Sequence, residues 1–271
     1  MLMPILNPIM RAILGARVGG AFDPLSLFAT GEVGVYYDPS DMSTLFQDSA
    51  GTTPVTAAGQ PVGKMLDKSG NGYHATQPTA GKRPLLQTDG TYWWLQGDGI
   101  DDCMSTNAID FTGTNKMTVW AGVRKVDDTV SIICELSAAI GNPGTFYSVT
   151  GTNVGGTGYS AISRGSAEVE LEQASRNFTY SGVDTAVITQ FHDIPGDLSR
   201  GWRNGVAGID GTADKGTGNF GNYPMYLMSR AGSGLFFNGR LYSLIVRGAA
   251  SSADELTKAN QWTASKCGVT L

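Results

Sequence analysis

The chain has 271 residues, of which 37 are glycine, 41 % are hydrophobic and only 16 % are charged. This combination excludes a helical bundle or coiled coil, and it lacks the high charge of a disordered protein. With 19 basic and 24 acidic residues the net charge is −5, so a broad cationic surface for nucleic acid or anionic membranes is not expected.

The first twenty residues are mainly apolar. Pro4 and Pro8 interrupt the start, so the pattern predicts a short helix from Pro8, with Asn7 as N-cap, that ends at Gly19–Gly20. Its large apolar side chains are Leu2, Ile5, Leu6, Ile9, Met10, Ile13 and Leu14. Such a helix must dock on its own domain or on another chain, and we favour another chain because the glycine pair resembles a hinge. We therefore separate an anchoring segment, residues 1–20, from a single domain, residues 21–271.

From Phe22 onward, short apolar runs alternate with turn residues. The run 116–124 alternates cleanly, and Asn204–Gly205 is a strong hairpin signal. Strands at this spacing with many glycine turns predict an antiparallel β-sandwich. The expected strands are 33–37, 91–95, 116–124, 130–136, 145–150, 158–163, 168–172, 177–180, 186–192, 199–203, 223–228 and 239–246.

One late segment has helical spacing instead. Ser251 or Ser252 is a natural N-cap, acidic residues follow in the first turn, and Gly268 is a natural stop. We expect a C-terminal helix on the sandwich, with Leu256 and Trp262 buried.

Three distant cysteines, Cys103, Cys134 and Cys267, form no C-x-x-C pair, and we expect them to be buried thiols of a protein made in a reducing cytoplasm. No stretch is long and apolar enough to span a membrane. The sequence contains none of the common nucleophile, zinc or phosphate-loop motifs.

Paired carboxylates on one strand would allow glycoside hydrolysis. Glu168, Glu170 and Glu172 fit this spacing superficially, but their neighbours include no aromatic residue that would line a cleft. A solvated edge strand is the preferred interpretation, and we expect no enzymatic activity.

Three stretches together resemble the concanavalin A-like, or laminin-G-like, jelly-roll domains. Residues 67–74 resemble the family's D-x-S-G-N-G-x-H turn, and residues 95–102 resemble its F-x-G-D-G-x-D-D turn. Residues 237–246, followed by a helix, are similar to its closing strand and helix. The resemblance implies an all-β, two-sheet antiparallel jelly-roll sandwich, here with a short N-terminal apolar helix or arm and one C-terminal helix.

The same resemblance raises the option of calcium, because Asp67, Asp98, Asp101 and Asp102 offer the oxygen ligands that this ion prefers. Asp and Gly together are also what tight turns require. The alternative is therefore that Asp67 and Asp101 are buried hydrogen-bond acceptors that fix the two loops. No other cofactor is expected.

A narrower resemblance covers residues 34–55 and continues through 60–63 and 66–69. These stretches resemble proteins encoded in the structural-gene regions of tailed bacteriophages and prophages. This implies a component of the virion, in the tail, baseplate or receptor-binding apparatus, made in the host cytoplasm.

The leading hypothesis is a non-enzymatic virion protein whose body binds a partner protein or a host-surface glycan. Its N-terminal segment would bind other virion proteins or copies of itself. One alternative is a glycan-cleaving enzyme on the same fold, and another is a purely structural capsid or tail decoration protein.

Overall fold

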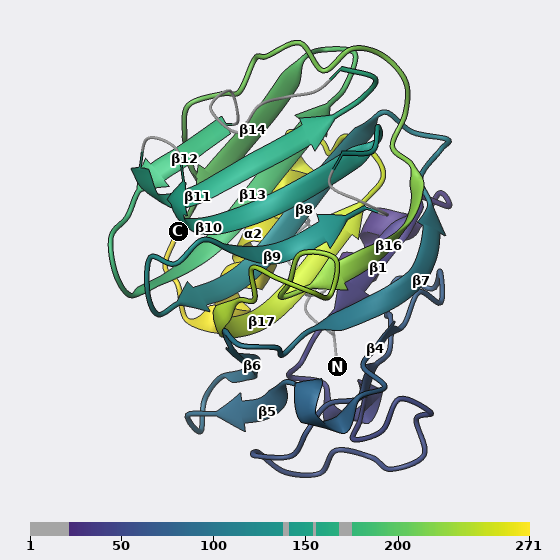
Figure 1. Cartoon of the computed structure of the whole chain (residues 1–271), viewed down its shortest axis with the longest axis vertical. Helices are drawn as coiled ribbons and strands as arrows, with labels where there is room; N and C mark the ends of the chain where they lie inside the picture. The colour runs from purple at the N-terminus through teal and green to yellow at the C-terminus, as the bar shows by residue number, and fades with distance from the viewer. Residues whose placement is uncertain (1–21, 138–140, 154–155, 168–174) are drawn as a thin grey trace, which may run out of the picture.

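The computed structural model describes residues 22–137, 141–153, 156–167 and 175–271. Within them it contains two antiparallel sheets and one α-helix, α2 (Ala253–Cys267), so the all-β sandwich prediction is confirmed (Figure 1). Three short 3₁₀ helices complete the elements: η1 (Pro24–Phe28), η2 (Met42–Thr44) and η3 (Ala80–Lys82). The predicted N-terminal helix and the predicted strand 168–172 lie outside the described residues.

The eight-stranded sheet has the order β15-β14-β13-β8-β17-β6-β5, and β1 pairs with β17 off this path. Its turns follow the sequence signals: Asn204 and Gly205 both have positive φ, 50° and 76°, as a two-residue hairpin turn requires. The strands are β1 (Gly34–Tyr37), β5 (Leu85–Thr88), β6 (Trp93–Asp98), β8 (Lys116–Lys125), β13 (Asp184–Asp193), β14 (Leu198–Arg203), β15 (Val206–Ala207) and β17 (Asn238–Arg247).

The nine-stranded sheet has the order β12-β11-β10-β9-β16-β7-β4-β3-β2. In Figure 1 its strands β9, β10 and β11 lie in front of β8 and β13 of the other sheet. The strands are β2 (Leu45–Phe46), β3 (Lys64–Met65), β4 (Ala75–Thr76), β7 (Met104–Asp110), β9 (Ser131–Leu136), β10 (Thr145–Asn153), β11 (Gly156–Arg164), β12 (Ser175–Thr179) and β16 (Asn222–Leu227).

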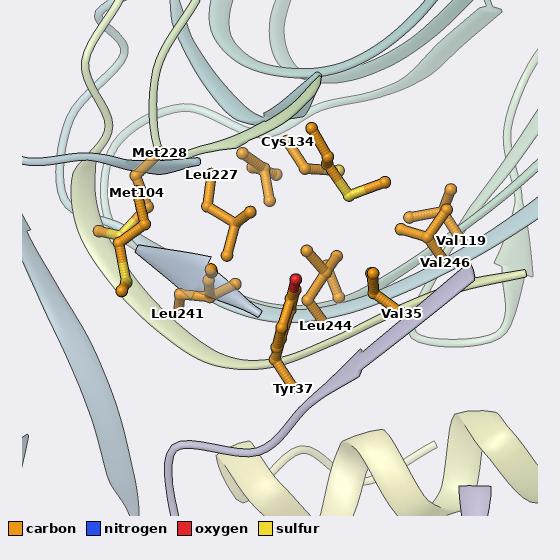
Figure 2. Packing of buried hydrophobic residues seen from close by; sticks show 14 of the residues in the cluster. Val35, Tyr37, Met104, Val119, Cys134, Leu227, Met228, Leu241, Leu244 and Val246 are labelled. Carbon is orange, nitrogen blue, oxygen red and sulfur yellow. The ribbon is translucent and has the colours of Figure 1, made fainter. Parts of the chain in front are cut away.

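The main core fills the space between the sheets. Figure 2 shows side chains from both sheets meeting there, among them Val119 and Leu244 from the eight-stranded sheet and Cys134 and Leu227 from the nine-stranded sheet. All of these are fully buried or nearly so. Because side chains alternate along a strand, each sheet also has an outer face, and the two outer faces differ in what covers them.

The outer face of the eight-stranded sheet is covered by α2 and η1. Ser252 caps α2 through a reciprocal capping box with Glu255, and Gly268 ends it at φ 71°. Trp120 packs beneath this layer and is fully buried. The prediction that Leu256 and Trp262 are buried is wrong, because small residues of α2 face the sheet and both large side chains stay half-exposed at its margin. Trp262 meets Tyr36 edge-on, with ring centres 5.3 Å apart.

The three cysteines are free and buried, as expected. Trp93 packs against the core between the sheets, whereas Trp94 lies on the opposite face of β6, near Ala264 and Cys267 of α2. No helix among the described residues is long and apolar enough to cross a membrane.

Candidate functional site

The structure separates the four predicted calcium ligands into two groups. Carboxylate oxygens of Asp98, Asp101 and Asp102 all lie within 4.8 Å of one another. Asp67 is not part of this cluster. The two predicted turns, residues 67–74 and 95–102, therefore have different roles in the fold.

Asp67 fixes a loop to strand β1. Its Oδ1 accepts hydrogen bonds from the backbone N–H groups of Tyr36 and Ser69, both at 2.9 Å. Its Oδ2 accepts from the Ser69 hydroxyl at 2.7 Å and from the N–H of Tyr73 at 3.1 Å. The loop also holds His74, whose Nδ1 accepts a hydrogen bond from the N–H of Asp67. For Asp67 this geometry agrees with the loop-fixing alternative.

In the Asp98–Asp101–Asp102 cluster, one carboxylate organises the turn and another is buried beside it. Asp98 Oδ1 accepts from the N–H groups of residues 100, 101 and 102. Burial disfavours the ionised Asp98, but these N–H groups outweigh it and lower the pKa of Asp98. Asp102 is only 8 % exposed, its carboxylate accepts from the backbone N–H of Asp98, and it forms no ion pair within the described part of the chain. Burial, followed by the charge of Asp98, raises the pKa of Asp102 to about 6.

This arrangement fits a cation better than it fits a simple turn. Three carboxylates approach each other, and the buried Asp102 has only a backbone N–H to stabilise its charge, so ionising all three costs free energy unless a positive charge is added. Oxygen ligands of this kind suit Ca²⁺, with backbone carbonyls or water completing its coordination. Calcium at Asp98, Asp101 and Asp102 therefore stays a prediction, now without Asp67.

We expect Ca²⁺ to raise the melting temperature of the protein by several degrees and a chelator to reverse this increase. An ion that binds only to the folded state stabilises that state. Replacing Asp102 by Asn should raise the melting temperature without calcium and remove most of the calcium response. Differential scanning calorimetry at pH 7 measures both effects, with Asp254→Asn on α2 as the charge-matched control. A calcium response of equal size in Asp102→Asn would contradict the prediction.

A second polar site, which sequence reasoning missed, lies on the outer face of the nine-stranded sheet. The register places Glu135 of β9 between Tyr147 of β10 and Tyr226 of β16. Residues paired in this way point to the same face of a sheet. Glu135 is fully buried and Tyr147 is 3 % exposed, whereas Tyr226 is half-buried.

Arg230 covers this row from the loop between β16 and β17. Its guanidinium carbon lies 5.5 Å from the centre of the Tyr147 ring, and its Nε lies 3.5 Å from Oε2 of Glu135. The other carboxylate oxygen of Glu135 accepts a hydrogen bond from the Ser137 hydroxyl. Burial raises the pKa of Glu135 against the opposing influence of Ser137 and Arg230. We refer to Glu135, Tyr147, Tyr226 and Arg230 as the Glu135 site.

The covering loop has an unusual backbone. Met228, Ala231 and Leu235 all have positive φ, at 65°, 50° and 44°, although none is glycine. Each such residue costs about 1–2 kcal/mol, and such strain clusters at functional sites. Backbone hydrogen bonds from Met228 to Ile133 and from Ile132 to Leu235 hold the loop against β9. Figure 1 shows this loop in front of β9 and β16.

The two histidines do not form a catalytic group. His74 supports the Asp67 loop, and His192 is fully buried between the sheets, where its Nδ1 lies 3.4 Å from the Ser199 hydroxyl. Burial and the nearby charge of Lys215 lower the pKa of His192 to about 3. The predicted carboxylates Glu168, Glu170 and Glu172, and the predicted interface residues Leu2, Ile5, Leu6, Ile9, Met10, Ile13 and Leu14, lie outside the described residues.

Comparisons with known proteins identify related folds only. No family model matches the chain, and no curated protein matches it. Among solved structures, an arabinofuranosidase in complex with arabinofuranosyl-α-1,2-xylobiose has a TM-score of 0.58 at 14 % identity, over 91 % of this chain and 65 % of that one. A GH54 α-L-arabinofuranosidase soaked with a cyclic sulfate inhibitor has a TM-score of 0.56 at 14 % identity, over 91 % and 66 % of the two chains.

A sialidase from Trypanosoma rangeli has a TM-score of 0.50 at 9 % identity, over 85 % of this chain and 32 % of that one. The chain thus spans between about a third and two thirds of the length of these structures. At such identities the likeness concerns the fold alone. The chain has an all-β sandwich fold that also occurs in these glycan-cleaving enzymes.

Proposed function

We propose that this protein binds a glycan on the outer face of the nine-stranded sheet, at the Glu135 site. The observation that carries the proposal is Arg230, which a strained loop holds over that face and which Glu135 and Tyr147 fix from below. The sandwich folds of the arabinofuranosidases and the sialidase give additional support, since those proteins act on sugars according to their names.

The chemistry of the site suits sugars. The Arg230 side chain is 25 % exposed, so part of its guanidinium can donate paired hydrogen bonds to neighbouring hydroxyl groups of a ligand. Tyr226 of β16 is half-buried and lies beside Gly232 of the loop that carries Arg230. Its ring offers an apolar face for a sugar ring. Glu135 is covered in this geometry, so its role in binding is to position Arg230.

We expect a glycan-binding screen to find a ligand whose affinity falls at least tenfold in Arg230→Ala and in Tyr226→Ala. Glu135→Gln should weaken binding less, because the amide oxygen can still accept from the Ser137 hydroxyl while the charge that attracts Arg230 is lost. Isothermal titration calorimetry measures the affinities, and Asp254→Asn serves as the control. Unchanged affinity in both Arg230→Ala and Tyr226→Ala would overturn the proposal.

A second candidate function is glycan cleavage, favoured by the raised pKa of the buried Glu135. A raised carboxyl pKa is a property that the general acid of a glycoside hydrolase needs, and burial supplies it at Glu135. Hydrolysis also requires a second carboxylate about 5–10 Å away. Release of 4-nitrophenol from 4-nitrophenyl α-L-arabinofuranoside, lost in Glu135→Gln, would support this function over binding alone.

A place in a phage virion is a further proposal. It rests on the resemblance of residues 34–55, 60–63 and 66–69 and on the apolar segment before Gly19. Deletion of residues 1–20 should leave the domain folded and more soluble but unable to join its assembly, because these side chains would form the interface. Antibody labelling of intact particles and size-exclusion chromatography measure the two effects. The segment would belong to the core instead if the shortened chain unfolds and the full chain assembles without needing the apolar side chains of residues 1–20.

A further inference from the structure

Two arginines lie directly opposite each other on the outer face of the eight-stranded sheet. Arg240 of β17 pairs with Arg124 of β8, and the same row continues to Gln96 on β6 and Thr185 on β13. All four side chains are half-buried. The row lies on the face that α2 covers, because Arg240 stacks on Trp94, which packs near Ala264 and Cys267 of that helix.

The arginine pair, Arg124 and Arg240, has no carboxylate at ion-pair distance among the described residues, whereas Arg200, Arg203 and Arg247 each pair with a carboxylate at 2.6 Å or less. Like charges directly opposite on neighbouring strands repel each other. The carboxylate of Asp89 acts on Arg240 beyond ion-pair distance and is fully exposed. Within the described residues the pair is therefore a local concentration of positive charge that only the exposed Asp89 partly offsets.

Neighbouring side chains hold both guanidiniums in place. Arg124 Nη1 donates to Thr185 Oγ1 at 3.1 Å, and the guanidinium carbon of Arg240 lies 3.9 Å from the centre of the Trp94 ring. Arg240 Nη1 lies 3.4 Å from the Tyr242 hydroxyl. Trp94 in turn donates to Gln96, whose amide nitrogen is bound to two backbone carbonyls. A fixed arginine loses less freedom when it binds a ligand.

We propose that Arg124 and Arg240 form a binding site for an oxyanion, a sulfate or carboxylate group of the kind that acidic sugars carry. Both guanidiniums lie close enough to the Tyr242 hydroxyl to influence its pKa. Planar guanidinium forks match oxyanions with paired hydrogen bonds, and an anion that both arginines contact would offset their like charges. The site lies on the opposite side of the sandwich from the Glu135 site and does not depend on the proposed function.

The test is a titration of the full chain with sodium sulfate and, separately, with a sulfated disaccharide, followed by calorimetry at constant ionic strength. We expect saturable binding that falls at least tenfold in Arg124→Gln and in Arg240→Gln. Arg124→Lys should keep part of the affinity, because the charge remains. Lys258→Gln on α2, which removes one exposed positive charge, should leave it unchanged.

Tighter binding of the disaccharide than of sulfate supports a sugar as the source of the oxyanion, and equal binding supports a free ion. A second readout is thermal stability at low salt. Arg124→Gln should not lower the melting temperature if the pair is repulsive, and only the wild type should gain stability from millimolar sulfate. Absence of saturable binding, or equal binding by Arg124→Gln and Arg240→Gln, would overturn the proposal. Glu135→Gln should not change sulfate binding, which separates this site from the glycan proposal.

Discussion

Replacing Asp67 by Ala should destabilise the protein by about 4 kcal/mol or more. The carboxylate is 9 % exposed and accepts hydrogen bonds from three backbone N–H groups and one hydroxyl. Each buried donor left without an acceptor costs about 1–3 kcal/mol. Alanine supplies no acceptor, so the loop must open to water or leave those donors unpaired.

Urea denaturation at pH 7 measures this effect, and Asp98→Ala provides the comparison at the other Asp–Gly loop. Asp98 also accepts hydrogen bonds from three N–H groups, but it is exposed and water can replace it as the acceptor. Its removal should therefore lower the free energy of unfolding much less. Equal destabilisation by the two substitutions would mean that burial does not distinguish the loops. A calcium response lost in Asp67→Ala but kept in Asp98→Ala would move the metal site to the first loop.

Acid should destabilise the protein through His192. The pKa of His192 is lowered to about 3 in the folded state, whereas in the unfolded chain it has its ordinary value of 6.5. Between these values the unfolded chain binds a proton that the folded chain does not, so the free energy of unfolding falls as the pH drops from 6.5 to 3. At about 1.4 kcal/mol per pH unit, the loss is on the order of 5 kcal/mol.

The groups around His192 explain why its protonation in the folded state is unfavourable. Its Nε2 has no hydrogen-bond partner among the described residues, Phe146 packs against its ring, and Lys215, itself 1 % exposed, adds a positive charge. His192→Gln removes the titration while keeping a polar side chain near Ser199. Urea denaturation from pH 7 to pH 4 should show that the free energy of unfolding of this variant depends less on pH. The difference in slope from the wild type should correspond to close to one proton taken up on unfolding. Parallel curves for the variant and the wild type would contradict the assigned pKa.

The sheet architecture was predictable because its signals are local. The strand pattern at 116–124, the Asn204–Gly205 turn and the capping box at Ser252 each depend on neighbouring residues only, and the structure confirms all three elements. Both faces of β8 are buried, however, because α2 covers the side that does not face the core. The full burial of Leu256 and Trp262 was predicted wrongly because small residues set the distance of α2 from the sheet. Ala259 and Thr263 allow close approach, which leaves Trp262 at the margin.

The Glu135 site was not predictable in the same way. One signal was present: Glu135 is a single charge in the otherwise uncharged run 131–136. Its partners, however, come from β10, β16 and the loop after β16, and only the pairing of strands brings Tyr147 and Arg230 to it. The two Asp–Gly loops show the same limit, because turn chemistry alone does not reveal which carboxylate is buried.

The most direct test of glycan binding at the Glu135 site is a chemical-shift map of the ¹⁵N-labelled protein titrated with the tightest glycan from the screen. We expect the largest shifts at the backbone amides of residues 229–234 and at Tyr226 and Glu135. Shifts confined to other surfaces, with the Arg230 loop unchanged at saturation, would contradict it.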